Sequence, residues 1–159
     1  MILESQKFQG PEGSQVLVLI HGMGSASSAW KPIIPELIKA MTVVTLDLPG
    51  HGKTPMSISQ AMDPRSLGDA VCETMTSLGI EKFHLCGNSL GGWVALEVAA
   101  KHSGRVLSVT GLAPAGLWLA PSLNLNGSRL LHFPCDEIGS KRIRYSLLLN
   151  LRHFFTILD

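Results

Sequence analysis

The sequence has little imbalance of charge and few cysteines. Its 13 Lys and Arg against 12 Asp and Glu give a formal net charge of +1, so no strong field would attract nucleic acid or an acidic partner. The three cysteines, Cys72, Cys86 and Cys135, are odd in number and fit no Cys-x-x-Cys spacing. A disulfide framework and a zinc site are therefore both unsupported, and we expect reduced packing residues and no metal.

Signals for export and for membrane insertion are also lacking. The first ten residues, MILESQKFQG, contain no basic segment followed by an apolar stretch, as a leader peptide would require. The apolar runs, such as 16–20 and 111–121, are too short to span a bilayer or are broken by Pro and Gly. The sequence predicts a cytoplasmic protein without a membrane span.

Apolar residues instead alternate between strand-like and helix-like spacing. The 159 residues, 45% of them hydrophobic, suit one globular α/β domain. Buried-strand and amphipathic-helix patterns take turns along the chain, with strands over 16–20, 42–48, 82–88 and 105–116 and helices over 27–41, 64–80 and 90–102. This alternation predicts a mostly parallel sheet with helices on both faces.

The pattern weakens after Gly116, so we divide the chain into a core over 1–116 and a tail over 117–159. The tail begins irregularly and ends in a predicted amphipathic helix over 143–159. Its apolar stripe consists of Leu147, Leu148, Leu151, Phe154, Phe155 and Leu158. Such a stripe most often packs into a core, and a lid helix over a substrate is the alternative.

Residues 87–91, Gly-Asn-Ser-Leu-Gly, satisfy the G-x-S-x-G pattern, with a predicted strand before them and a helix after them. In such a turn the serine is exposed and its backbone strained, and the glycines remove Cβ atoms that would collide. The helix N-terminus adds amide groups and a dipole that favour an oxyanion. The alternative for Ser89 is an ordinary helix N-cap.

Two glycine-containing loops accompany the serine: His-Gly-Met-Gly at 21–24 and Asp-Leu-Pro-Gly-His-Gly at 47–52. With the turn at 87–92 they follow the order of motifs in the α/β-hydrolase family, which the chain resembles. Residues 50–54, GHGKT, are similar to the end of a phosphate-binding loop, but Asp47 stands where that motif needs glycine. We expect Asp47 and His51 to tie down their own loop.

The resemblance implies that Ser89 is the nucleophile and that the backbone N–H groups of Met23 and Leu90 form the oxyanion hole. His21 would support the geometry of the oxyanion loop, in the crevice between the first and third strands. It also implies a small-molecule acyl substrate, such as a carboxylic ester, a thioester or an activated C–C bond, and no cofactor. The alternative is a catalytically silent domain that binds a small apolar ligand or a partner chain.

A reactive serine needs a histidine and a carboxylate, which in the family follow later strands. Only one clear strand is predicted after Ser89. His84 and His102 lie about 16 Å and about 20 Å away along a strand and a helix, too far to reach the serine. The remaining candidates lie in the tail: His132, His153, Asp136, Glu137 and Asp159.

We therefore expect a chain truncated after the N-terminal core, with the C-terminal strands of the family missing and little activity of its own. The fourth predicted strand would then be an edge strand, open to aggregation unless the tail helix or another chain covers it.

Overall fold

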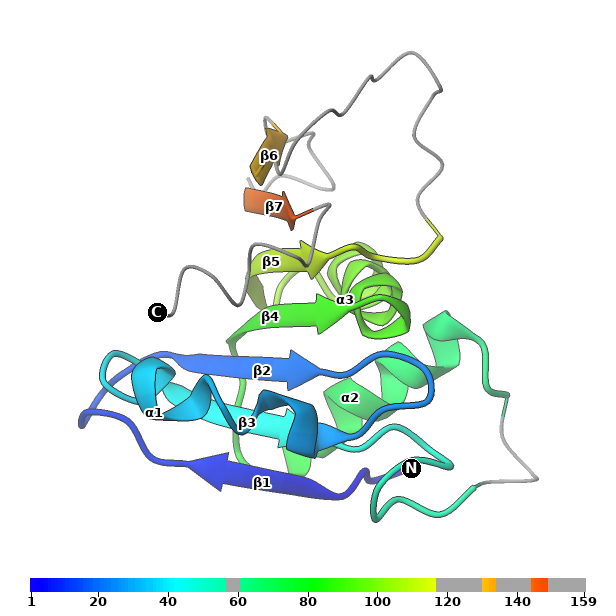
Figure 1. Ribbon diagram of the computed structural model, residues 1–159, viewed down its shortest axis with the longest axis horizontal. Helices are drawn as coiled ribbons and strands as arrows, with labels where there is room; N and C mark the ends of the chain where they lie inside the picture. Colours follow the sequence, from blue (N-terminus) through cyan, green and yellow to red (C-terminus); the bar gives the residue numbers. More distant parts are fainter. Residues whose placement is uncertain (57–60, 117–129, 134–143, 149–159) are drawn as a thin grey trace.

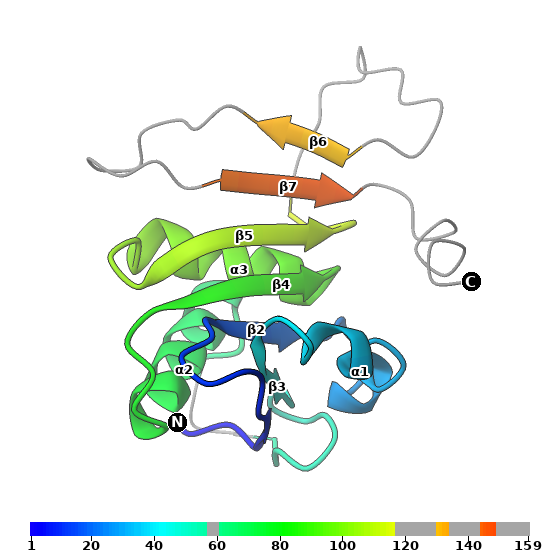
Figure 2. The same cartoon turned by 90° about the vertical axis from the view of Figure 1, so that its left-hand side faces the viewer.

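The computed structural model describes residues 1–56, 61–116, 130–133 and 144–148, the last two ranges as backbone. Within these ranges, seven strands form one sheet in the order β1-β3-β2-β4-β5-β7-β6 (Figures 1 and 2). The elements in chain order are β1 Ser5–Phe8, β2 Val16–Ile20, the 3-10 helix η1 Ser27–Trp30, α1 Ile34–Leu37, β3 Thr42–Leu46, α2 Pro64–Ser77, β4 Phe83–Asn88, α3 Leu90–Lys101, β5 Val106–Leu112, β6 Leu130–Phe133 and β7 Arg144–Leu148.

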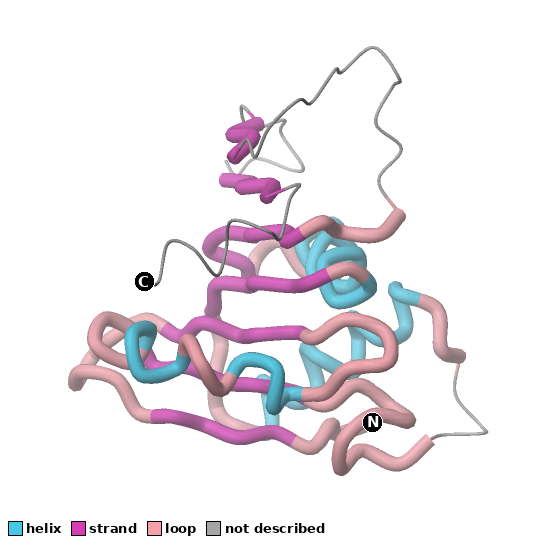
Figure 3. The backbone as a smooth tube through the Cα atoms, in the orientation of Figure 1, coloured by secondary structure: helices cyan, strands magenta, loops and turns pink. Residues whose placement is uncertain are grey.

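The sheet is mostly parallel, as predicted. Strands β3, β2, β4, β5 and β7 run in one direction, and the two edge strands, β1 and β6, are antiparallel to their neighbours. The loops that follow β2, β3, β4 and β5 consequently leave the sheet at one edge, on the right in Figures 1 and 3. In open parallel sheets this carboxyl edge is where ligands bind.

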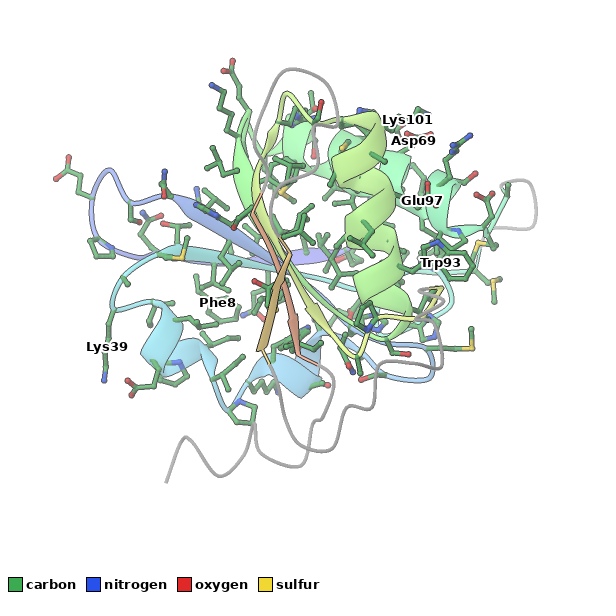
Figure 4. All side chains as sticks on the ribbon, turned by 90° about the horizontal axis from the view of Figure 1, so that it is seen from above. Phe8, Lys39, Asp69, Trp93, Glu97 and Lys101 are labelled. Atoms are coloured by element: carbon green, nitrogen blue, oxygen red, sulfur yellow. The ribbon has the colours of Figure 1, made fainter. Side chains whose placement is uncertain are left out.

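Helices lie on both faces of the sheet, which confirms that prediction. Helices α2 and α3 cover one face, and η1 and α1 cover part of the other; in Figure 4 the labelled Trp93 and Phe8 lie on opposite sides. Side chains alternate along the buried strands, so Val18 of β2 packs toward α2 and α3 while Leu19 packs toward Trp30. Among the described residues, no helix is long and apolar enough to cross a bilayer.

Helix α2 begins at the predicted residue and ends at Ser77, before the predicted bound at 80, and both ends have local causes. The Asp63 side chain accepts hydrogen bonds from the amides of Arg65 and Ser66, and Pro64 occupies the first turn, where its missing N–H costs nothing. Gly79 follows the helix with a φ of 70°, the left-handed conformation in which helices commonly end. The buried face of α2 includes Val71 and Met75, which join the larger of two hydrophobic clusters.

The prediction of one continuous helix over 27–41 is wrong. The segment forms η1 and the four-residue α1 instead, joined through Pro32. The amides before α1 bond three residues back, as in Lys31 N to Ser28 O at 3.2 Å and Ile33 N to Trp30 O at 3.1 Å. Pro32 and Pro35 cannot donate such bonds and restrict the residue before them, so the turns tighten and the helix is interrupted.

The prediction of a helix over 143–159 is wrong for residues 144–148. These form β7, which pairs in parallel with β5, and Ser108 to Leu112 face Arg144 to Leu148 in register. The prediction of a single strand after Ser89 is wrong as well, and β5 is not an edge. The periodicity of such a short apolar run cannot distinguish a strand from a helix. Pairing with β5 decides for the strand, because it provides hydrogen-bond partners for the backbone of residues 144–148. Residues 149–159 lie outside the described residues.

Strand β1 escaped the sequence analysis. Its residues, SQKF, are mostly polar and exposed, so they show no apolar alternation. The strand forms because its backbone pairs with β3 at the edge of the sheet, where side chains contribute little.

Candidate active site

Ser89 occupies a strained turn between β4 and α3. Its φ of 50° and ψ of −113° lie in a region that costs a residue with a Cβ about 1–3 kcal/mol. Backbone hydrogen bonds to the end of β5 hold it there: Ser89 N donates to Leu112 O at 3.0 Å, and Ala115 N donates to Ser89 O at 2.9 Å. The residues after β5 therefore fix the turn, a contribution that the sequence analysis missed although Pro114 and Gly116 mark a turn there.

The glycines around Ser89 are required by close backbone contacts. A Cβ on Gly87 would overlap the carbonyl of Gly91, and a Cβ on Gly91 would overlap the carbonyl of Ile20 at the end of β2. A Cβ on Gly92 would lie 2.6 Å from the Cβ of Pro114. The turn thus packs tightly against both neighbouring strands, which is the reason for the glycines expected from the sequence.

Ser89 does not serve as an ordinary helix cap. It occupies the N-cap position of α3 by its backbone, but its side chain makes no capping hydrogen bond. An N-cap serine would use its hydroxyl for one of the first helical amides. The alternative that we left open for Ser89 is therefore wrong, and the half-buried hydroxyl has no hydrogen-bond partner among the described residues.

The loop after β2 lies directly beside the serine. A Cβ placed on Gly22 would be 3.3 Å from the Cβ of Ser89, a tight contact that would push the loop and the serine slightly apart. The Met23 side chain is 75% exposed. Within the described part of the chain, the amides of Met23 and Leu90 donate to no protein acceptor, and their predicted role as oxyanion donors remains a prediction.

Asp47 ties down the loop after β3, as predicted. One carboxylate oxygen accepts the Ser27 amide at 2.7 Å and the other accepts the Lys53 amide at 3.0 Å. Burial works to raise the pKa of Asp47, but the hydrogen bonds from Ser27 and Lys53 outweigh it and lower the pKa below the ordinary value. The carboxylate accepts one amide of its own loop and one of η1, and its negative charge fits no phosphate site.

His21 and His51 also serve the loops. The buried His21 accepts the Leu48 amide at Nε2, 3.0 Å away, and His51 accepts the Gly24 amide at Nε2, also 3.0 Å away. Burial lowers the pKa of His21, more than its contact with the Gly22 carbonyl raises it. The Nδ1 atoms contact carbonyls of their own loops, Gly22 for His21 and Pro49 for His51, as expected. The bonds at Nε2 reach the other loop, which the sequence did not indicate.

The other described histidines lie away from the serine, as predicted. The ring nitrogens of His84 are 2.7 Å from Ser108 Oγ and 2.9 Å from Gln15 Oε1, and His102 Nε2 is 2.8 Å from Asp69 Oδ1. His132 lies on β6, where the structure describes the backbone. The further candidates for the histidine and the acid lie outside the described residues: His153, Asp136, Glu137 and Asp159.

The cysteines fit the predicted packing role where they are described. Cys72 and Cys86 are free thiols, and burial raises their pKa to about 11 and about 12. No group of three metal-binding side chains occurs among the described residues. Cys135 lies outside them.

Comparison with known proteins agrees with this geometry. Residues 15–131 match the family model described as alpha/beta hydrolase fold. The chain is 39% identical over 124 residues to the "Dihydrolipoyllysine-residue acetyltransferase component of acetoin cleaving system" of Pseudomonas putida, covering 78% of this chain and 32% of that protein. It is 34% identical over 112 residues to "Pimeloyl-[acyl-carrier protein] methyl ester esterase" of Aeromonas hydrophila, covering 70% of this chain and 41% of the relative.

A solved structure shows the same likeness in three dimensions. The enol-lactonase from Burkholderia xenovorans LB400 superposes with a TM-score of 0.67 at 26% identity, over 76% of this chain and 46% of that one. The chain belongs to the α/β-hydrolase fold family. It spans less than half the length of each of these three relatives.

Proposed function

We propose that the protein is a serine hydrolase that cleaves a carboxylic ester or thioester, with Ser89 as the nucleophile. The observation that carries the proposal is the strained φ of 50° at Ser89, which persists although the serine side chain caps nothing. Backbone strain of this kind persists mainly at functional sites, where the direction of a side chain is worth a loss in the stability of the fold. The relatives named as an esterase and a lactonase support an ester substrate.

In the proposed reaction, Ser89 Oγ forms a bond to the substrate carbonyl carbon, and the alcohol or thiol leaves with the serine proton, which a base transfers. Water then attacks the acyl-serine, which releases the acid and restores the hydroxyl. The amides of Met23 and Leu90 would stabilise the oxyanion, and one such donor contributes about 10²–10³-fold in rate. His132 and His153 are the candidates for the base in this chain, with Asp136 and Asp159 for the acid.

Exposed apolar side chains support an apolar acyl group. Met23 and Met56 are 75% and 62% exposed and come from the loops after β2 and β3. Trp93, in the first turns of α3, lies against Gly116 and donates its ring N–H to Glu97 at 3.2 Å. Exposed apolar groups next to a candidate site are more often functional than those scattered over a surface.

A fluorophosphonate probe tests the proposal. Ser89 Oγ would bond to phosphorus and displace fluoride, so the intact mass should rise by one adduct in the wild type and not in Ser89→Ala. Ser28→Ala is the matched control, because Ser28 is exposed on η1 and distant in sequence from the turn. A folded wild type that gains no adduct would contradict the proposal and favour the silent, ligand-binding alternative.

A further inference from the structure

The two histidines at the carboxyl edge share one tautomer, which their partners dictate. His51 Nε2 accepts the Gly24 amide, and its Nδ1 is 2.9 Å from the Pro49 carbonyl. Because a carbonyl can only accept, Nδ1 carries the proton and Nε2 offers its lone pair. His21 repeats the arrangement, with the Leu48 amide at Nε2 and the Gly22 carbonyl 2.7 Å from Nδ1.

These contacts link the loop after β2 to the loop after β3 at two points. The ring centroids of His21 and His51 are 5.1 Å apart, and each ring bonds both loops. His21 reaches the carbonyl of Gly22, and His51 reaches the amide of Gly24. The two loops lie at the same edge of the sheet in Figures 1 and 3.

The two points of attachment flank Met23. The Gly22 carbonyl and the Met23 N–H belong to one planar trans peptide, so they point in opposite directions. The Gly22 carbonyl accepts hydrogen bonds from His21 Nδ1 and from the Ser25 amide, 3.2 Å away. The Met23 N–H therefore points to the other side. The next peptide, between Met23 and Gly24, is held by His51. Each peptide plane on either side of Met23 is thus fixed by one neutral imidazole.

We propose that His51, together with His21, is a positioning residue that fixes the direction of the Met23 amide. The proposal rests on the proposed function for the importance of that amide, but the hydrogen bonds themselves do not depend on it.

The hydrogen bonds can be observed directly by NMR on the uniformly ¹⁵N-labelled chain. Scalar coupling across an N–H···N bond should connect the Gly24 amide nitrogen with His51 Nε2, and the Leu48 amide nitrogen with His21 Nε2. Both rings should show the Nδ1–H tautomer at neutral pH. An Nε2–H tautomer at His51, or no coupling to Gly24, would overturn the proposal.

Two variants separate positioning from general stability. His51→Gln keeps an acceptor at similar reach, whereas His51→Met has similar length and no comparable acceptor. In His51→Met the Gly24 amide should exchange with solvent about tenfold faster, the effect of losing one hydrogen bond, and His51→Gln should restore slow exchange. The rate of fluorophosphonate labelling at Ser89 should fall in His51→Met and recover in His51→Gln.

The outcomes distinguish this inference from the proposed function. A wild-type coupling together with unchanged labelling in His51→Met would overturn the positioning role and leave Ser89 as a working nucleophile. If the wild type takes no label, the proposed function fails, and the coupling and the Gly24 exchange rates alone decide whether His51 holds the loop.

Discussion

Replacing Ser89 with glycine should give a more stable protein than replacing it with alanine. The φ of 50° and ψ of −113° at Ser89 are close to the mirror image of extended backbone, which glycine adopts readily. Alanine removes the hydroxyl but keeps the Cβ and therefore the strain. Both variants lose the hydroxyl of the proposed nucleophile, so the comparison isolates the backbone.

The expected difference follows from two opposing terms. Removing the Cβ recovers about 1–3 kcal/mol of strain, whereas the extra freedom of glycine in the unfolded chain costs about 0.5–1 kcal/mol. The bonds from Ser89 N to Leu112 O and from Ala115 N to Ser89 O join backbone atoms and persist in both variants. The glycine variant should be more stable by about 1 kcal/mol, with about 2.5 kcal/mol as the upper bound, and about 1 kcal/mol raises the unfolding midpoint by about 2–4 °C in a chain of this size.

Urea unfolding followed by circular dichroism would measure this difference. Ser28→Gly and Ser28→Ala form the matched pair, since Ser28 is exposed and is not among the described residues of positive φ. At Ser28 the glycine variant should be the less stable by about 0.5–1 kcal/mol. The reasoning is refuted if glycine is also the less stable choice at position 89.

Two further predictions concern the surroundings of the serine. Gly91→Ala should destabilise the fold by about 3 kcal/mol, because its Cβ would overlap the Ile20 carbonyl and lie 2.5 Å from the His21 oxygen. Gly104→Ala, with open space around the new Cβ, should stay within about 0.5 kcal/mol, and equal urea midpoints for the two variants would contradict the packing argument. The lowered pKa of Asp47 means that its carboxylate stabilises the fold fully above the ordinary pKa and loses this contribution as the pH falls through the folded-state pKa. In Asp47→Asn the free energy of unfolding should therefore decrease less steeply as the pH falls. An unchanged decrease would contradict the stabilising role of the Asp47 carboxylate.

Much of the core was predictable because its signals are local. The strands over 16–20 and 42–48 are apolar runs bounded by turns, and α2 carries its own cap at Asp63 and its own stop at Gly79. The G-x-S-x-G pattern located the turn at Ser89, and the loop motifs indicated that Asp47 and His51 hold their loop. The strand β1 was not predicted because a polar edge strand has no apolar period. The break in 27–41 was not predicted because the apolar spacing there continues across Pro32 and Pro35, which interrupt the hydrogen bonds of the helix.

The sequence by itself determined the alternation of strands and helices, the position of the turn at Ser89 and the glycines beside it, because these depend on neighbours a few residues away. Only the tertiary structure decided that residues 144–148 pair with β5, that the end of β5 holds Ser89 in its strained conformation, and that His21 and His51 join two loops. Those contacts connect residues far apart in the chain. A hydrogen bond between distant segments does not change the spacing of apolar residues in either segment, so sequence periodicity cannot predict it. Its donor and acceptor meet only in the folded structure.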